Sequence, residues 1–480
     1  MFEVSDCISK VKTLNRRDLL IFLIPFIVFT LYLYVFNPGI LAFDSYNQLH
    51  QIATGQFDSW HPFFHTFIEM MCLKVYGSPA SVAVLQIVTF SAFWMIICKY
   101  NRDDSQNGKK TFAIQLIITL VIALIPINPI FSLNLQKDIL FSYLLLMLCF
   151  MMEVLIDRRA NVGYSFAIVL SIVLAFIAQL RYNGMVLVLV FLVILAIWMY
   201  LKNTDIRLVA LIPALTIVFI LLIASLNIAY DVEEHRDDAL CLMVGHMLAD
   251  YDMNHKIDAS DEAKLHKFVD KNKSIKYYNV LWKDPTRNNI LHKDVWKEDK
   301  GTYIKMAIDY SFKHPMHFIT YLLNAAPIVW QITRDADWQH ANGGVYNTNN
   351  TGHRDGFYDK RNKTPAADFD NATSVNIGTP QYDALNNWVN FAKDNIVLDT
   401  IFDSPALYMY LAIIILVVLF WITRLRDLWL IYLPNLLNIA IVFVSIPAQL
   451  NRYLYPNLLV CYLLVIILVG ILIRRKAEAV

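Results

Sequence analysis

Long apolar runs, separated by short polar segments, set the pattern of this chain. The runs are about 18–22 residues long, which is enough to cross a hydrocarbon core of roughly 30 Å at 1.5 Å per helical residue. The pattern predicts an all-α membrane protein with about ten transmembrane helices. The expected spans are 18–36, 79–98, 111–127, 138–156, 164–180, 184–201, 207–228, 405–423, 428–447 and 454–473.

The first long segment between spans is the outer loop 37–78. It contains an amphipathic stretch, 61–76, that begins His61-Pro62, and proline is favourable in the first turn of a helix. The stretch is too short and too polar to span a membrane. We therefore expect a juxtamembrane helix that lies along the membrane surface.

The second long segment, 229–404, is expected to form one large, partly helical extracytoplasmic loop. Ser260 is expected to cap a helix over 261–269, and helical periodicity recurs over 299–313 and 316–331. We interpret 316–332 as a juxtamembrane helix, because one more crossing there would reverse the side of every later basic cluster.

The residues that follow, 335–380, are rich in Asn, Gly, Asp and Thr, a composition typical of irregular loops. The expected organisation has three parts: an N-terminal transmembrane catalytic module of seven spans (1–228), the extracytoplasmic loop domain (229–404) and a C-terminal module of three spans (405–480).

Basic residues fix the expected orientation, because cytoplasmic loops carry an excess of Lys and Arg. In the ten-span layout six basic clusters share one side, and both termini lie there, in the cytoplasm. The clusters are Lys10–Arg17, Lys99–Lys110, Arg158–Arg159, Lys202–Arg207, Arg424–Arg426 and Arg474–Lys476. A multi-pass membrane protein follows, with 18–36 as a signal anchor rather than a cleaved signal peptide. Placement in the plasma membrane is implied only by the family resemblance described below.

Composition agrees with this class. Hydrophobic residues make up 57% of the chain and charged residues 17%, against about 45–50% and about 25% in soluble domains. Mean hydropathy is +0.45. The net charge of +1 gives no reason to expect a nucleic-acid partner.

Several charged and polar residues lie at the opposite, outer ends of the spans, where charge is costly in a membrane protein. They are Asp44, His61, Lys137, Asp138, Arg181, Asn183, Arg452 and Tyr453. Arg grips phosphate bidentately and Lys adds a point charge, so the three cations are expected to converge on one phosphate or pyrophosphate. Asp44, which begins the first outer loop, is the candidate general base for a hydroxyl.

Each of these residues also has a simpler interpretation. Arg181 could snorkel to lipid phosphates, and Arg452 could serve as a headgroup anchor beside Tyr453. Lys137 and Asp138 could form a local ion pair of little energetic value. Asp44 could be a helix cap or turn former.

His61, His65 and Glu69 share one helical face at i, i+4 and i+8. Histidine pairs at this spacing can bind a metal, but the stretch lacks the HExxH pattern of zinc hydrolases. No cofactor is therefore certain from the sequence, and a divalent metal stays an open alternative that the motif pattern does not support. Trp330 and Trp338 could contact a sugar face, although belt or packing roles fit them better.

The ordered set of motifs resembles the GT-C superfamily of polytopic membrane glycosyltransferases, and a bacterial branch of it most closely. The motifs are Phe43-Asp44-Ser45, His61-Pro62, Lys137-Asp138, Arg181-Tyr182-Asn183-Gly184 and Arg452-Tyr453 with Pro456. The resemblance covers about 37–230 and 400–475, and only loosely 301–333.

The resemblance implies transfer of a sugar from a polyprenyl-phosphate donor of the undecaprenyl type to a glycan, lipid or protein acceptor at the extracytoplasmic face, in cell-envelope polysaccharide modification. It implies that Asp44 is catalytic and that Lys137, Arg181 and Arg452 hold the donor phosphate. His61, Asp138, Asn183 and Tyr453 would line the substrate site. Many relatives carry two adjacent acidic residues where this chain has Asp44-Ser45, which argues against a metal-dependent variant.

Two other functions remain open from the sequence. A transporter or flippase of lipid-linked sugars would place its charges near the bilayer midplane and would often show internal repeats, which this sequence lacks. A glycan polymer ligase or polymerase would differ from a glycosyltransferase in donor and acceptor size rather than in the chemistry of the site.

Overall fold

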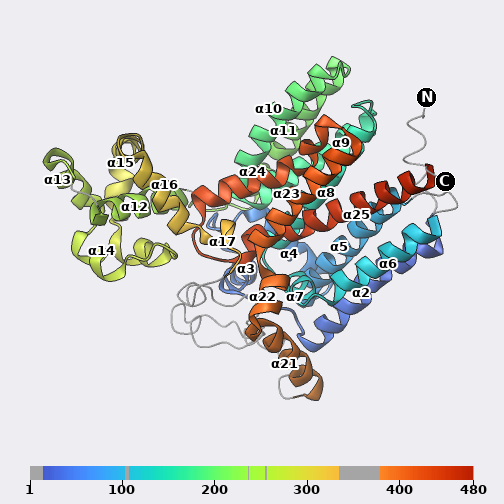
Figure 1. The fold of residues 1–480 in the computed structure, drawn as a ribbon. Coiled ribbons are helices and arrows are strands. Elements are labelled where there is room, and N and C mark those ends of the chain that lie inside the picture. The colour runs from blue at the N-terminus through green and yellow to red at the C-terminus, as the bar shows by residue number, and fades with distance from the viewer. Residues whose placement is uncertain (1–13, 103–107, 236, 255–256, 334–378, 479–480) are drawn as a thin grey trace. The chain divides into compact units, whose positions relative to one another are not determined.

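The computed structural model describes residues 14–102, 108–235, 237–254, 257–333 and 379–478 (Figure 1). Most of the expected irregular loop, 335–380, and Trp338 lie outside the described residues, and α21 begins at Pro380. Within these ranges the regular structure is helical, and the only β-pairing is in isolated bridges.

The helices of the N-terminal half follow the apolar runs closely. The long ones are α2 (Arg16–Val35), α5 (Ala80–Tyr100), α6 (Gly108–Leu124), α8 (Lys137–Asp157), α9 (Tyr164–Leu180), α10 (Tyr182–Leu201) and α11 (Ile206–Ala229). Between them lie three shorter helices: α3 (Phe43–Thr54), α4 (Phe63–Val75) and α7 (Ile127–Leu133). The expected surface helix 61–76 corresponds to α4, whereas α3 and α7 were not expected from the sequence.

Helices also make up most of the rest of the described chain. They are α12 (Asp237–Asn254), α13 (Ala259–Phe268), α14 (Lys271–Tyr277), a π-helical turn (Thr286–Ile290), α15 (Lys293–Lys313), α16 (Pro315–Ala325) and α17 (Pro327–Trp330). After the gap come α21 (Pro380–Asp394), α22 (Ile396–Asp403), α23 (Pro405–Thr423), α24 (Trp429–Ser445) and α25 (Tyr455–Glu478), with short 3-10 turns before α24 and α25.

Eight of the described helical segments are long and apolar enough to cross a membrane, and a ninth is obtained if α6 and α7 are counted as one bent span. The axis turns by 64° between α6 and α7, at Ile125-Pro126, because proline cannot continue the hydrogen-bonding of a helix. Helix α9 is apolar but has only 17 residues. The expectation of a multi-pass helical membrane protein is confirmed, while the count of ten spans stays a prediction.

The chain divides into two compact units. The first takes its residues from Met1–Val232, Tyr346–Asn438 and Arg452–Val480, and the second from Glu233–Val345 and Ile439–Asn451. The spans expected before residue 229 and the last span therefore belong to one unit. The three-part division expected from the sequence stays a prediction.

Helix α8 is the central helix of the first unit. Nearly every side chain from Asp138 to Ile156 is buried, and the helix packs against α5, α9 and α25. By contrast, α11 buries only Leu208, Ile212 and Thr216 and leaves many apolar side chains exposed, as a lipid-facing helix does. The side chains in the first turn of α8 are therefore held at the centre of the first unit.

A buried ion cluster joins the start of α2 to the end of α5. The carboxylate of Asp18, which is fully buried, lies 3.1 Å from Lys99 Nζ and accepts a hydrogen bond from Arg102. Asn15 caps α2 and Asp18 completes a capping box there. Lys99 and Arg102 were interpreted only as topology signals, so the structure adds a packing role for them.

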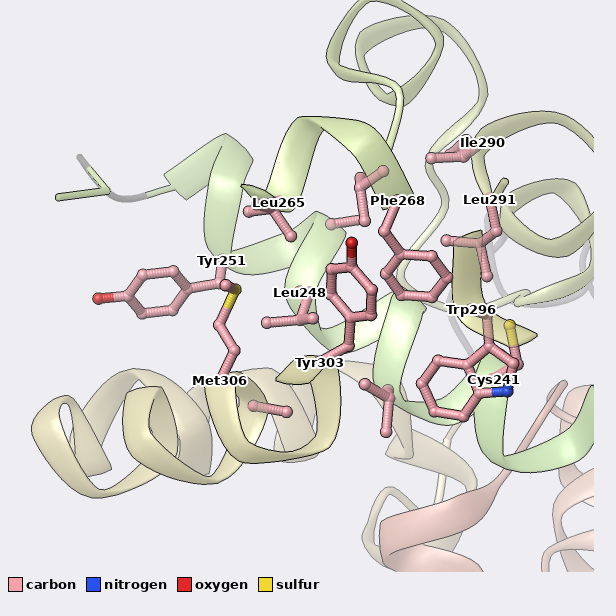
Figure 2. Close-up of a cluster of buried hydrophobic side chains, with 14 of the residues drawn as sticks. Cys241, Leu248, Tyr251, Leu265, Phe268, Ile290, Leu291, Trp296, Tyr303 and Met306 are labelled. Atoms are coloured by element: carbon pink, nitrogen blue, oxygen red, sulfur yellow. The ribbon is translucent and has the colours of Figure 1, made fainter. Parts of the chain in front are cut away.

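The second unit has its own hydrophobic core (Figure 2). The ring of Phe268 stacks on Trp296 and lies 4.5 Å from the ring of Tyr303, centroid to centroid. The expected cap of the helix at 261–269 is wrong by two residues: α13 is preceded by Asp258, and Ser260 lies inside its first turn. Pro327 divides the expected helix 316–331 into α16 and α17.

Candidate functional site

A backbone pairing brings the start of α3 beside the start of α8. Ile40 donates its amide to Leu133 O (2.8 Å) and accepts from Leu135 N (3.1 Å). Gly39 makes this approach possible, because its φ is +125° and a Cβ there would lie 2.7 Å from Leu135 Cδ1 and 3.0 Å from Leu133 O. Two segments almost a hundred residues apart are thereby held side by side.

Ser45 strengthens the same junction. Its hydroxyl accepts a hydrogen bond from Ala42 N and donates one to Leu135 O, and the side chain is fully buried. Asp44, the preceding residue, therefore lies in the first turn of α3 rather than in an irregular loop. An anionic side chain is favourable in the first turn of a helix.

The carboxylate of Asp44 contacts three groups from three different segments. Oδ2 accepts a hydrogen bond from Arg452 Nη2 (3.2 Å) and lies 3.7 Å from Lys137 Nζ. Oδ1 lies 3.6 Å from His61 Nε2. The side chains of Asp44, Lys137 and Arg452 keep between 13% and 19% of their surface exposed, so these charged groups remain accessible from outside the protein.

A second carboxylate, Asp138, joins the two arginines. Asp138 is fully buried in the first turn of α8, with Oδ1 3.1 Å from Arg181 Nε and Oδ2 3.4 Å from Arg452 Nε. Lys137, its neighbour in the sequence, turns instead to Asp44 and His61. The interpretation of Lys137 and Asp138 as only a local ion pair is therefore not what the geometry shows.

Arg181 is held at the turn between α9 and α10, where its backbone is extended. Gly184 allows the two helices to approach, because a Cβ at that position would lie 2.1 Å from the carbonyl oxygen of Ile177. The hydroxyl of Tyr182 donates to Ser59 O, which ties this turn to the segment that leads to His61.

Aromatic rings pack around the arginines. The guanidinium carbon of Arg181 lies 5.0 Å from the Phe141 ring centroid and 5.2 Å from that of Tyr453, and Arg452 also lies over the Tyr453 ring at 5.1 Å. Phe141 was missed from the sequence, although it lies one helical turn after Asp138. Asn183 is half-buried in the first turn of α10, and its role in substrate binding stays a prediction.

The contacts of His61 define its protonation. Lys137 Nζ lies 3.2 Å from His61 Nδ1, and an ammonium can only donate, so Nδ1 accepts and the ring proton is assigned to Nε2, which faces Asp44. Burial, together with the Lys137 charge, lowers the pKa of His61 to about 3. His61 is thus neutral near pH 7.

Electrostatics also fix the charge of Asp44. Burial by itself would raise the pKa of its carboxyl, but the positive charges of Arg452 and Lys137 prevail and hold that pKa well below its usual range. Asp44 is therefore ionised near pH 7. With His61 neutral, the five charged residues, three cations and two carboxylates, carry a net charge of about +1 at that pH.

Next to His61, a group of buried polar side chains that is neutral overall lies along α4. His65 Nδ1 lies 3.2 Å from Gln48 Oε1 and 3.7 Å from Glu69 Oε1, and all three side chains are buried. Burial lowers the pKa of His65 to about 3 and raises the pKa of the Glu69 carboxyl well above its usual range. Over the described part of the chain, no group of three or more His, Cys, Asp or Glu side chains is arranged to hold a metal ion.

Of the eight site residues expected from the sequence, seven make direct contacts within one cluster. They are Asp44, His61, Lys137, Asp138, Arg181, Arg452 and Tyr453, and we call this set the charged cluster. The chain matches no protein-family model, and no curated protein and no solved structure is significantly similar to it. The function has to be argued from the cluster itself.

Proposed function

We propose that the protein is a membrane glycosyltransferase that moves a sugar from a polyprenyl-phosphate donor to an acceptor hydroxyl at the extracytoplasmic face, as the resemblance to the GT-C superfamily implies. The proposal includes ten spans with both termini in the cytoplasm. The observation that carries it is the charged cluster, in which three cations and two carboxylates from four separate segments meet at the beginnings of helices.

The charge of the cluster fits a lipid phosphodiester. A sugar linked to a lipid through one phosphate carries a single negative charge, which the net charge of about +1 would neutralise. Arg181 Nη1 is buried and has no hydrogen-bond partner among the described residues, and a buried donor without an acceptor is destabilising. A phosphate oxygen is a suitable acceptor, and the starts of α8 and α10 add partial positive charge.

The proposed reaction is an exchange of one bond at the anomeric carbon. The acceptor oxygen forms a bond to that carbon while the bond from the carbon to the phosphate oxygen breaks, and the lipid phosphate leaves with the electron pair. Asp44 takes the proton of the acceptor hydroxyl. The phosphate gains one negative charge as Asp44 loses one, so the total charge in the site does not change.

Binding of the donor would also activate the base. In the free protein Arg452 and Lys137 stabilise the charged form of Asp44, and a strongly stabilised carboxylate is a weak base. A donor phosphate that accepts hydrogen bonds from the same two cations would weaken their hold on Asp44. The carboxyl pKa would then rise only when the donor is in place.

Binding and turnover measurements test this proposal. Purified wild type, Asp44→Ala and Lys137→Gln would be incubated with polyprenyl-phosphate sugars, and bound donor and released lipid phosphate would be measured. We expect Asp44→Ala to bind donor without turnover. Lys137→Gln should weaken donor binding by about 10- to 100-fold, because hydrogen bonds to charged groups contribute about 1.5–3 kcal/mol.

The matched control for Lys137→Gln is Lys202→Gln, which removes a lysine that is 38% exposed and is paired with Asp427, at the opposite end of α10 from Arg181. Turnover by Asp44→Ala at the wild-type rate would exclude Asp44 as the base. If the wild type neither binds nor consumes such lipids, the glycosyltransferase proposal fails, and transport of a lipid-linked sugar becomes the function to test.

A further inference from the structure

The second unit has an apolar face that no described residue of the protein covers. Phe312 at the end of α15 is 81% exposed, and Met316, Ile319 and Leu323 on α16 are 72%, 47% and 38% exposed. On α16 the spacing of three and four residues places Met316, Ile319 and Leu323 along one side of the helix, and Phe312 lies just before the break that separates α15 from α16. Large apolar side chains gathered in this way usually mark a contact surface.

The same helix α16 is apolar on its other side as well. Tyr321, Leu322 and Ala325 are buried and form a small hydrophobic cluster, against which Phe318 and Phe443 pack. At about 100° per residue, this buried side points roughly opposite to Met316 and Leu323. Because α16 is apolar on two opposite sides, we expect its exposed side to be shielded from water as well.

Residues at and just after the end of α24, which belong to the second unit, lie next to α16. The segment Arg426–Ser445 is long and apolar enough to cross a membrane, so we expect its end at Ser445 to lie near the boundary between hydrocarbon and headgroups. Just before that end, Phe443 contacts the buried side of α16. Just after it, Gln449 donates to Ala325 O (2.7 Å) and accepts from Ile328 N (3.3 Å).

Within the second unit, helix α16 therefore contacts the residues at and just after the end of α24 through both apolar contacts and hydrogen bonds. Trp330, which donates its indole N–H to Leu323 O, is 37% exposed beside the apolar face, and tryptophan is enriched where membrane meets water. Lys313 and His314 lie at the break before α16 and are exposed, which suits side chains at the level of lipid headgroups.

We propose that Phe312, Met316, Ile319 and Leu323 form a lipid-binding face that embeds the second unit in the headgroup and upper acyl region of the bilayer. The occupant is the lipid surface itself, because α16 packs on the end of α24, and that end is expected to lie at the boundary of the hydrocarbon core. The proposal is independent of the reaction assigned to the charged cluster.

Fluorescence quenching in nanodiscs tests the proposal. The six native cysteines would be replaced, and a single cysteine at position 312, 316 or 319 would carry an environment-sensitive dye on the full-length protein. Lys297→Cys, on an exposed side of α15, is the matched control. Quenching by lipids with a nitroxide on the acyl chain would be compared with quenching by iodide in water.

We expect lipid nitroxides to quench the dye at positions 312, 316 and 319 several-fold more strongly than at 297, with iodide showing the reverse order. Strong iodide quenching at position 316, without lipid quenching, would overturn the proposal. Cross-linking between two copies through position 316, or protection from both quenchers, would mean that protein covers the face and would overturn it equally. Because three positions are labelled separately, a variant that fails to fold does not remove the test.

Discussion

Arg452 donates a hydrogen bond of 3.2 Å to the carboxylate of Asp44 although 408 residues separate the two in the chain. The same arginine also lies 3.4 Å from Asp138, so it connects the carboxylates at the starts of α3 and α8. The residues that precede the last apolar helix therefore complete a charged cluster that α3 begins.

The pH dependence of turnover should reveal how this pair responds to donor. The pKa of Asp44 is held low in the free protein, and kcat/KM reports the free enzyme whereas kcat reports the enzyme with substrate bound. If the donor phosphate accepts hydrogen bonds from Arg452 and Lys137, the pKa of Asp44 should rise. The acid limb of the kcat profile should then lie at higher pH than that of kcat/KM. Coincident acid limbs in steady-state assays across a pH series would contradict activation of Asp44 by donor.

Asp138→Asn should destabilise the protein strongly, because it leaves Arg181 and Arg452 without their shared carboxylate. Removal of one partner from a buried pair costs about 3–5 kcal/mol of folding free energy. Unfolding titrations in mixed detergent micelles would measure the change. Asp427→Asn is the control, since Asp427 and its partner Lys202 are about a third exposed and such a pair contributes about 0–1 kcal/mol. Equal losses in both variants would show that Asp138 is not an essential buried partner.

Burial of His65 should make the protein less stable in acid. Its pKa is about 3 when folded and about 6.5 when unfolded, so the unfolded chain binds more protons between those values. Folding free energy is therefore lost as pH falls below about 6.5, by about 1.4 kcal/mol per pH unit for this residue. His65→Gln should reduce the slope of unfolding free energy against pH between about 6 and 4.

The control for that slope is His235→Gln, which removes a histidine that is 37% exposed. An unchanged slope in His65→Gln would mean that His65 protonates without unfolding. The slope is the informative readout, because the substitution also removes the contact with Gln48 and lowers stability at every pH.

Gly184→Ala should separate α9 from α10. An alanine Cβ would lie 2.1 Å from the backbone oxygen of Ile177, and a backbone atom cannot move aside as a flexible side chain can. We expect a loss of about 1–3 kcal/mol or more in folding free energy, together with weaker donor binding because Arg181 is three residues away. Gly77→Ala, where a Cβ would meet nothing within 4 Å, should leave both quantities unchanged. Wild-type stability in Gly184→Ala would show that the two helices can part at no cost.

Local sequence determined the helical membrane class and the positions of most helices. A run of about 20 apolar residues has to satisfy its own backbone hydrogen bonds inside lipid, so the run itself specifies a helix. The cost of placing charge near lipid made Lys137, Arg181 and Arg452 conspicuous without any knowledge of the fold. Helix α3 was missed because Phe43–Thr54 is mostly polar, although its few apolar residues do recur at helical spacing.

Only the tertiary structure decided which of these residues pair. Lys137 could have bonded to its neighbour Asp138, yet the Ile40–Leu135 backbone pairing and the hydroxyl of Ser45 bring Asp44 to it instead. Asp18, inside the first apolar helix, showed no sign in the sequence of its buried partners Lys99 and Arg102. Hydrophobic length is a local property of the chain, whereas the partner of a charge depends on which distant segments the packing brings within a few ångströms.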